Sequence, residues 1–425
     1  MKDYQSFINS LAKLISFKTV KSAPAPNAPF GKQTADALNY LLDLANSFGL
    51  KTINYDNYGG EVILGQGEQV GIIGHIDVVP EGGGWNTDPY TLTEKDGVLY
   101  ARGVLDDKSG TLACLYALKE LKESGLSINR TFRLIIGCNE EDGWKDIDYI
   151  KTKTTLPKYG FSPDGNFPLS YAEKGMYELI FSIPKLKNFT DVKGGIALNA
   201  VCAYASVTAT PQGINHDLLK KHGLSLKNDN VIESFGKSAH GSHPELGENA
   251  LKPLFNYFLD MGENVKDVVD NLFLDKKNLC ALQNEQGFVT FSPDIILQKD
   301  DEIIIKVDCR IPAPLQIDDV KKIVDTFGID YSIGHFLPPV MMQKNGSFIR
   351  TLLNAYNFVT GENLEPISLG GSTFARVFEC GCAFGPEFPN GDGCCHEANE
   401  HVSVSELIRA YDIYKKAIFD LAKGE

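Results

Sequence analysis

Apolar and polar positions over residues 1–175 follow the two spacings expected of an α/β domain. Residues 3–50 carry apolar side chains at helical spacing, broken by a proline-rich loop at 22–29. A strand-like run at 61–65 and a continuous Val/Ile run from Val70 come next, and such an uninterrupted run is typical of a buried central strand. Helical spacing returns in TLACLYALKELKES, and TFRLIIGC is a second buried-strand candidate. Strand, helix and strand in this order predict an α/β sheet, whose ligands bind beyond the strand ends.

The pattern changes over residues 176–339. Alternating segments such as YELIFSI and DEIIIKVDCRI stand there beside helical ones such as NALKPLFNYFLDMG, which predicts an α+β insertion. The α/β pattern returns afterwards through the Gly-rich turn SLGGSTFAR, the apolar run CAFGPEF and a terminal helix from Val404. We therefore predict one discontinuous α/β domain, formed by residues 1–175 and 340–425, with an inserted domain at 176–339.

Length, composition and charge exclude several classes of protein. The 425 residues, 43% of them apolar and 23% charged, fit a globular chain of two domains or of one domain with a large insertion. A formal charge of −14 would repel a phosphate backbone, so we expect no nucleic-acid partner. No apolar run reaches the roughly 20 residues that span a bilayer, and the start of the chain lacks the features of a signal peptide. We expect no membrane partner.

The cysteines favour a reducing compartment. There are nine, an odd number, and they are scattered except for the adjacent Cys394 and Cys395. This usage suits the cytoplasm better than a disulfide scaffold. Because the sequence has no CxxC pair with zinc-ribbon spacing, any metal would be held mainly by histidines and carboxylates.

Polar clusters lie at the predicted strand ends, and each has an ordinary structural explanation when it is taken alone. His75 and Asp77 alternate in a strand, so they share a face and the carboxylate can orient the imidazole. Asp106 and Asp107 precede a helix, where they would serve equally well as an N-cap. A single cluster is therefore a weak indication of a metal site.

Three later positions are equally ambiguous. Glu140 and Glu141 are adjacent carboxylates after a buried strand, which repel each other unless a cation offsets the charge, but a solvated acidic loop would explain them too. Asp164 lies in FSPDGNFP, where a simple Asp-Gly turn is the alternative. His396, in CCHEANEHVS, would equally fit a buried or surface histidine.

The order of these clusters changes that assessment. The succession GHIDVVPEGGGWNTDPY, ARGVLDDKSG, NEEDGW, FSPDGNFP, GKSAHG, GGSTFAR and HEANE resembles the M20 family of metallopeptidases, and within it the PepV-like (Xaa-His type) dipeptidases. The resemblance runs from about residue 5 to residue 420. It implies a zinc-peptidase catalytic domain with a mixed central sheet flanked by helices, plus an inserted α+β lid domain.

The resemblance also implies a site with two zinc ions, for which cobalt or manganese can substitute. Such ions lie roughly 3.5–4 Å apart, hold a hydroxide and polarise a carbonyl. Asp77 would orient a metal-binding histidine, and Glu140 would be the general base. A strained cis peptide would link Asp106 to Asp107. The metal ligands would be His75 and Asp164 for one ion, Glu141 and His396 for the other, and Asp106 for both.

Five further residues would reach the substrate by the same resemblance: Asn199, His240 and Arg310 in the lid, and Thr373 and Arg376 in the GGSTFAR turn. His240 would donate a hydrogen bond to the oxyanion of the tetrahedral intermediate, and Arg310 would bind that oxyanion or a substrate carboxylate. The lid is longer than that of dimeric relatives and resembles a two-lobed form. We therefore expect His240 to act on the metals of its own chain, which favours a monomer and leaves a dimer open.

Some positions depart from the family pattern. Cys138 and Asn139 stand where close relatives usually have Thr-Asp, and Gly165 and Asn166 stand where acidic character is usual. NAVCAYAS lacks the proline that typically follows the lid asparagine, so Asn199 has the weakest support. Cys395 is interpreted as a buried thiol rather than a ligand.

Three functions remain open from the sequence. The leading one is a dipeptidase acting on a small-molecule dipeptide. The second is a deacylase or carboxypeptidase-like amidohydrolase of N-acyl amino acids, because the same zinc chemistry serves several amides. The third is a catalytically silent binding homologue, against which the presence of all five ligands and Glu140 argues.

Overall fold

The computed structural model describes residues 3–391 and 394–424, and the chain forms two compact units. The first unit comprises Met1–Tyr171, Met342–Leu369 and Thr373–Glu425, and the second comprises Ala172–Met341 with Gly370–Ser372. The predicted insertion, residues 176–339, lies within the Ala172–Met341 part of the second unit. None of the helices among the described residues is both long enough and apolar enough to cross a membrane.

The first unit is built on a mixed sheet with a parallel centre. β3 is parallel to β6 and β7, and β21 is parallel to β7, whereas β1 and β2 pair antiparallel with their neighbours. In sheet order these strands are β1 (Lys51–Asn54), β2 (Gly59–Gly65), β6 (Arg130–Gly137), β3 (Glu68–His75), β7 (Tyr159–Ser162) and β21 (Cys380–Ala383). The next strand, β8 (Ser170–Glu173), carries the chain into the second unit, and β19 (Val340–Met341) and β20 (Ile367–Leu369) each pair with it.

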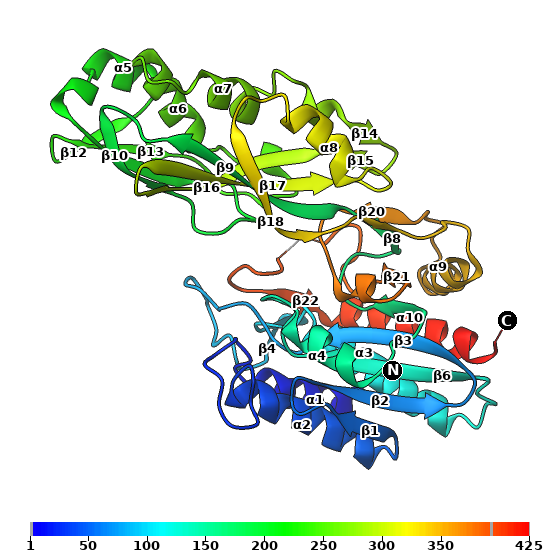
Figure 1. The fold of residues 1–425 in the computed structure, drawn as a ribbon. Coiled ribbons are helices and arrows are strands. Elements are labelled where there is room, and N and C mark those ends of the chain that lie inside the picture. The colour runs from blue at the N-terminus through cyan, green and yellow to red at the C-terminus, as the bar shows by residue number, and fades with distance from the viewer. Residues whose placement is uncertain (1–2, 392–393, 425) are drawn as a thin grey trace. The chain divides into compact units, whose positions relative to one another are not determined.

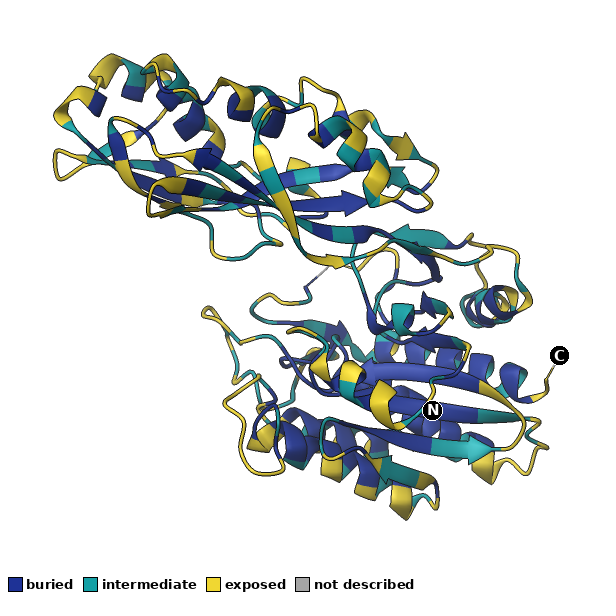
Figure 2. Ribbon diagram, in the orientation of Figure 1, coloured by how far each residue is buried: buried dark blue, intermediate teal, exposed yellow. Residues whose placement is uncertain are grey.

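Helices cover both faces of this sheet (Figure 1). The two glycines at the start of β2 show the division, because a side chain at Gly60 would meet Leu38 and Leu42 of α2, whereas one at Gly59 would meet Ile150 of α4. The β-strand residues between the layers are buried (Figure 2). The helices of this unit are α1 (Tyr4–Ile15), α2 (Lys32–Ser47), α3 (Lys108–Glu123), α4 (Lys145–Lys153), α9 (Ser347–Thr360) and α10 (Val404–Ala422).

A small antiparallel sheet precedes the C-terminal helix of the first unit. It consists of β4 (Thr93–Lys95), β5 (Val98–Tyr100) and β22 (His401–Ser403). α10 begins directly after β22, because the Ser403 side chain accepts a hydrogen bond from the backbone N–H of Glu406 and the Glu406 carboxylate binds the Ser403 N–H in return. This capping box fixes where the helix starts.

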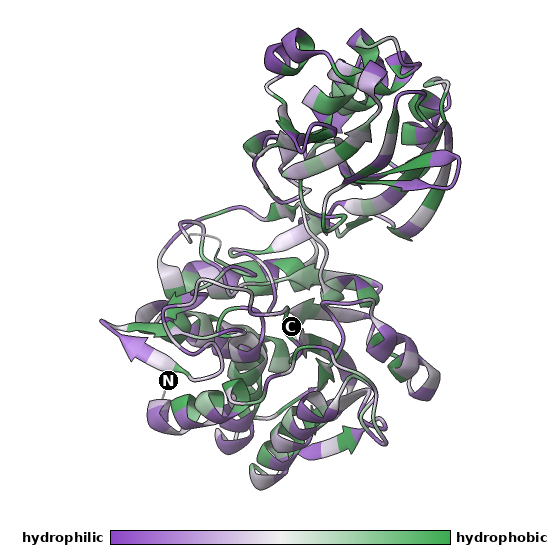
Figure 3. Cartoon of the chain, turned by 90° about the vertical axis from the view of Figure 1, so that its left-hand side faces the viewer, coloured by the Kyte–Doolittle hydropathy of each residue, from purple (hydrophilic) through white to green (hydrophobic). Residues whose placement is uncertain are grey.

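The second unit is one antiparallel sheet with helices along one face (Figure 1). The eight strands in order are β12 (Ser225–Lys227), β13 (Val231–Phe235), β11 (Tyr204–Ala209), β10 (Phe189–Gly194), β16 (Thr290–Lys299), β17 (Glu302–Ile311), β9 (Gly175–Pro184) and β18 (Asp330–Leu337). The helices are α5 (His216–Lys221), α6 (Leu251–Asp260), α7 (Lys266–Val268) and α8 (Ile317–Val324), and β14 (Gln283–Asn284) pairs with β15 (Gly287–Phe288). In both units hydrophilic residues gather on the outer turns of the helices (Figure 3).

Alternating buried and less buried residues explain the strands of the second unit. Along β9 every second residue is buried, from Gly175 through Tyr177 to Ile183, as expected of a sheet with one covered face. The alternation fails near the end of β17, where Asp308 to Ile311 are all buried. Polar residues therefore lie inside the unit at this end of the sheet.

One of these buried polar residues is Asp294 on β16. Ser292 Oγ donates to its Oδ1 over 2.5 Å, and its Oδ2 is buried without a hydrogen-bond partner in the described part of the chain. Burial raises the pKa of Asp294 to about 8, although the hydrogen bond from Ser292 opposes this rise; the smaller effects of Asp308, which raises the pKa, and Arg310, which lowers it, follow. The neutral carboxylic acid is therefore the form that suits this position.

We expect Asp294→Asn to stabilise the protein increasingly as pH rises from about 4 to 8. The unfolded chain loses the Asp294 proton near pH 4, whereas the folded protein keeps it until about pH 8. The wild type therefore loses up to about 1.4 kcal/mol of stability for each pH unit in this window, and the uncharged asparagine loses none. Urea unfolding at pH 5, 6, 7 and 8 measures the difference. The exposed Asp300→Asn is the control, and a difference that does not change with pH would contradict the argument.

Candidate metal centre

The parallel strands of the first unit bring the predicted ligands to one edge of the sheet. His75 ends β3, Glu141 follows the end of β6, and Asp164 follows the end of β7. Because parallel strands present their carboxyl ends together, three ligands that are distant in sequence become neighbours. Asp106 joins them from the loop before α3, and His396 joins them from the loop before β22.

Asp106 faces both histidines. Its Oδ1 lies 2.9 Å from Nε2 of His75, and its Oδ2 lies 3.0 Å from Nε2 of His396. His75 Nε2 is 3.7 Å from Oδ2 of Asp164, and His396 Nε2 is 3.2 Å from Oε1 of Glu141. The five residues form two groups, His75 with Asp106 and Asp164, and Asp106 with Glu141 and His396, and in each group the ligand atoms lie within 4.8 Å of one another.

The chemistry of these groups fits divalent cations. His75 Nε2 and Asp106 Oδ1 are both buried and face each other at 2.9 Å, but among the described residues neither atom makes a hydrogen bond with suitable geometry. Buried polar atoms without partners are costly, and a metal ion between an imidazole nitrogen and a carboxylate oxygen would satisfy both. An imidazole and carboxylate donor set with no sulfur is also one that zinc, cobalt and manganese accept.

The pKa shifts of the acidic residues also indicate a site for cations. Burial raises the pKa of Glu140 well above its usual value, and burial together with Asp106 raises that of Glu141 to about 6. Burial and Asp106 likewise raise the pKa of Asp164. More carboxylate charge is gathered here than the site can hold without added positive charge.

The two histidines are shifted toward their charged form, whereas the acids above are shifted toward their neutral form. Burial opposes protonation of His396, but Asp106 and Glu141 raise its pKa to about 11. Burial opposes protonation of His75 as well, yet Asp106, Asp164 and Asp77 raise its pKa well above the usual value. Burial also opposes ionisation of Asp106, but the two imidazoles hold its pKa well below the ordinary range.

Asp77 contacts His75 in a way that differs from the expectation. Its backbone carbonyl oxygen is 3.0 Å from His75 Nδ1, whereas its carboxylate is 3.5 Å from that nitrogen. The carboxylate instead accepts backbone N–H groups, from Glu140 at Oδ1 and from Glu141 at Oδ2, both at 3.1 Å. Since the carbonyl can only accept, Nδ1 donates and Nε2 is left to face Asp106. Asp77 thus holds the turn that carries Glu140 and Glu141.

The peptide bond from Asp106 to Asp107 is cis, as predicted. Oδ2 of Asp107 accepts hydrogen bonds from the His75 N–H at 3.2 Å and from Thr111 Oγ1 at 2.9 Å. A side chain at Gly74 would come within 2.3 Å of the same oxygen. The loop before α3 therefore packs directly on the end of β3.

Sequence reasoning missed two buried acids beside the ligands. Asp146, in the first turn of α4, accepts the N–H groups of Cys138 at 2.7 Å and Asn139 at 2.9 Å, and burial raises its pKa to about 7. Glu400 is the second, and it binds the loop before α3. In the sequence Asp146 looks like an ordinary acid at the start of a helix, so nothing indicated its role. Glu400 is the last residue of the HEANE motif, and this position could have indicated it.

The structure shows the burial and the contacts of the residues that depart from the family pattern. Cys138 and Asn139 are fully buried and held through their backbones by Asp146. The Asn166 side chain donates to Oε2 of Glu387 at 2.9 Å. Cys395 is partly buried, burial raises the pKa of its thiol, and neither ligand group includes it.

The GGSTFAR turn lies beside His75. Thr373 Oγ1 accepts the N–H of Ala375 at 3.1 Å and caps the 3₁₀ turn η5 (Phe374–Val377), to which the half-buried Arg376 belongs. The Phe374 ring stands edge-on to the His75 imidazole, with 6.2 Å between ring centroids. Phe374 thus packs against the imidazole of His75.

The three lid residues come together in the second unit. The Gly241 N–H, next to His240, donates to the backbone oxygen of Asn199 at 2.7 Å. Arg310 Nε donates to both carboxylate oxygens of Asp308, at 2.8 and 2.9 Å. A side chain at Gly241 would come within 2.3 Å of Asp308 Oδ2, so Asp308 packs against the His240 loop while it holds Arg310.

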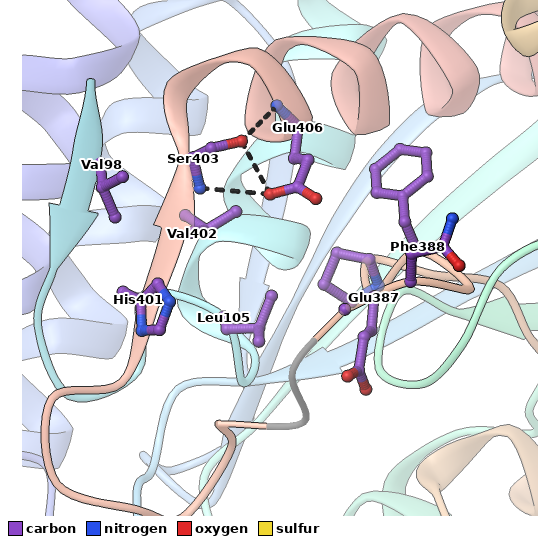
Figure 4. Close-up of a pocket in the computed structure, with 11 residues that line it drawn as sticks. Val98, Leu105, Glu387, Phe388, His401, Val402, Ser403 and Glu406 are labelled. Atoms are coloured by element: carbon purple, nitrogen blue, oxygen red, sulfur yellow. Dashed lines mark hydrogen bonds between the residues drawn. The ribbon is translucent and has the colours of Figure 1, made fainter. Parts of the chain in front are cut away.

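A pocket lies next to the Asp106 loop (Figure 4). Leu105, the neighbour of Asp106, forms part of its wall, but the described lining residues include none of the predicted ligands. The lining residues are Val98, Leu105, Pro386, Glu387, Phe388, Asn390, Gly391, His401, Val402, Ser403 and Glu406. The pocket is therefore separate from the two ligand groups.

A family model and several known proteins match this chain. The model of Peptidase family M20/M25/M40 matches residues 71–420. A putative dipeptidase of Staphylococcus epidermidis is 30% identical over 97% of this chain and 96% of its own length. The fold matches human carnosine dipeptidase 1 with a TM-score of 0.63 at 16% identity, covering 99% of this chain and 97% of that one. It also matches the Bacillus subtilis YXEP protein, described as a dinuclear metal binding peptidase from the M20 family, with a TM-score of 0.53 at 10% identity over 99% and 98% of the chains. The chain therefore belongs to peptidase family M20/M25/M40.

Proposed function

We propose that this M20 peptidase is a dipeptidase that works with two zinc ions in the first unit. One observation carries the proposal: Asp106 directs its two carboxylate oxygens at the Nε2 atoms of His75 and His396, 2.9 and 3.0 Å away. A carboxylate placed in this way is suited to bridge two cations. The naming of full-length relatives as putative dipeptidases supports the substrate class.

The division of roles follows the two ligand groups. His75 and Asp164 would hold one ion, Glu141 and His396 the other, and Asp106 both. When bound, zinc lowers the pKa of water and polarises a carbonyl oxygen. Glu140 belongs to neither ligand group, and Asp77 fixes its backbone beside Glu141. Its carboxylate would take the proton from the attacking water and pass it to the leaving amine.

The second unit would supply the lid. Asp308 holds Arg310 through Nε, and the terminal nitrogens of the guanidinium would make a bidentate contact with a substrate carboxylate or with the oxyanion. His240 would donate a hydrogen bond to the oxyanion. We propose that Asn199, Thr373 and Arg376 complete the substrate contacts.

A substrate panel tests the function. Dipeptides, the matching N-acetyl amino acids and tripeptides are compared at equal concentration, with and without a chelator. We expect dipeptides to be hydrolysed at least tenfold faster than the other two classes, chelation to abolish activity, and zinc, cobalt or manganese to restore it. Faster cleavage of N-acetyl amino acids would indicate the deacylase. No hydrolysis by metal-loaded protein would indicate a binding homologue, and full activity in metal-stripped protein would refute the metal mechanism.

Glu140→Gln should lower turnover by about 10²–10⁴-fold with both metal ions retained, because it removes proton transfer and leaves every proposed ligand in place. Elemental analysis and steady-state kinetics measure the two effects. Asp142→Asn, which alters the next acid in the same loop, is the control and should keep full turnover. If Glu140→Gln loses metal instead, the roles of Glu140 and Glu141 have been exchanged.

The same variant tests whether the lid serves its own chain. We propose that His240 acts in cis, so that a monomer in the cytoplasm is sufficient; the nine cysteines, none of them in a disulfide, suit that compartment. An equimolar mixture of Glu140→Gln and His240→Ala proteins should then show only the sum of their residual activities. Recovery toward one quarter or more of wild-type activity would show that the histidine is supplied in trans.

A further inference from the structure

Glu400 is a buried carboxylate that the proposed chemistry does not use. It is 1% exposed and ends the loop that begins at His396. Its Oε2 accepts Arg102 Nη1 at 2.8 Å and the Gly103 N–H at 2.9 Å. Its Oε1 accepts the N–H groups of Leu105 at 2.8 Å and Asp106 at 3.2 Å. Four donors from the loop before α3 thus converge on one side chain.

Arg102 extends this contact to two other loops. Its Nη2 lies 3.3 Å from the backbone oxygen of His396, and 3.5 Å from those of Pro80 and Glu81 in the loop after β3. The guanidinium is buried with Glu400 and its carbon lies over the Trp85 ring, 5.3 Å from the centroid. The loops that follow His75, carry Asp106 and contain His396 are therefore tied to one buried ion pair.

The chemistry at this position requires a carboxylate. Donors approach both oxygens, so both must accept, and only an ionised carboxyl group offers two acceptors. A glutamine would turn its NH₂ group either toward Arg102 and Gly103 or toward Leu105 and Asp106, and one set of N–H groups would lose its acceptor. The backbone of Asp106 would then be released on one side.

We propose that Glu400 is a positioning residue for the metal centre. It fixes the backbone from which Asp106 directs one oxygen to each histidine, and through Arg102 it fixes the backbone of His396. The spacing at which Asp106 is shared between the two ligand groups depends on this contact. The inference rests on the proposed function in one respect, that the two groups bind metal ions.

The chain contains a matched control. Glu61 on β2 is also 1% exposed and also paired with a buried arginine, Arg133, whose Nη2 donates to Glu61 Oε2 at 2.9 Å. Arg133 also donates to Gln69 near the start of β3, whereas His75 ends that strand. Loss of the Glu61 charge therefore disrupts a buried ion pair of the same kind without touching the loops of the metal centre.

The experiment compares Glu400→Gln and Glu61→Gln with the wild type in metal-free form. Cobalt is titrated into each protein and the visible absorption spectrum is recorded, while thermal unfolding of the metal-free proteins measures the structural cost. We expect Glu400→Gln to weaken cobalt binding by about 10–100-fold and to change the spectrum of the bound cobalt. Glu61→Gln should lower the unfolding temperature by a similar amount, with wild-type cobalt affinity and spectrum.

Each outcome has one meaning. Wild-type cobalt affinity and spectrum in Glu400→Gln would overturn the positioning role, and so would an equal change in both variants. If the wild type itself binds no cobalt, the metal part of the proposed function fails first. If Glu400→Gln does not fold, Arg102→Lys replaces it, because lysine keeps the charge but lacks the planar fork that places one nitrogen on Glu400 and another on the His396 oxygen. Unchanged cobalt binding in folded Arg102→Lys protein would equally refute the proposal.

Discussion

Buried carboxylates cannot remain ionised side by side unless positive charge or hydrogen-bond donors lie against each of them. The first unit meets this constraint in two layers. The outer layer consists of carboxylates that accept backbone N–H groups, namely those of Asp77, Asp107, Asp146 and Glu400. The inner layer faces the two imidazoles and consists of Asp106, Glu141 and Asp164. The outer acids accept N–H groups of the protein, apart from Oδ1 of Asp107, which is buried without a partner among the described residues, whereas the inner acids form the two ligand groups.

The layers also explain why several loops converge. Each outer carboxylate holds a different segment: Asp77 the Glu140–Glu141 turn, Asp107 the end of β3, and Asp146 the residues that follow β6. The sheet brings the strand ends together, and these contacts hold the loops that follow them. The same device recurs in the second unit, where Asp308 fixes Arg310 and packs against Gly241. In both units an acid that takes no part in the proposed chemistry positions a residue that does.

Much of this fold could be predicted because its signals are local. Continuous apolar runs predicted β3 and β6 as buried strands, helical spacing predicted α3, and the candidate ligands His75, Glu141 and Asp164 lie at or after strand ends. The supporting contacts could not be predicted in the same way. Arg102 and Glu400 are 298 positions apart, and only the folded chain shows that they meet. Asp77 illustrates a second limit, because its alternation with His75 predicts a shared face but not that its carbonyl, rather than its carboxylate, reaches the imidazole.

The central claim is that Asp106 is shared between two metal ions. Anomalous scattering at the zinc edge, measured from crystals of the zinc-loaded protein, tests it most directly. We expect two peaks, one between His75 and Asp164 and one between Glu141 and His396, each with one oxygen of Asp106 as a ligand. A single peak, or two peaks of which only one contacts Asp106, would contradict the account.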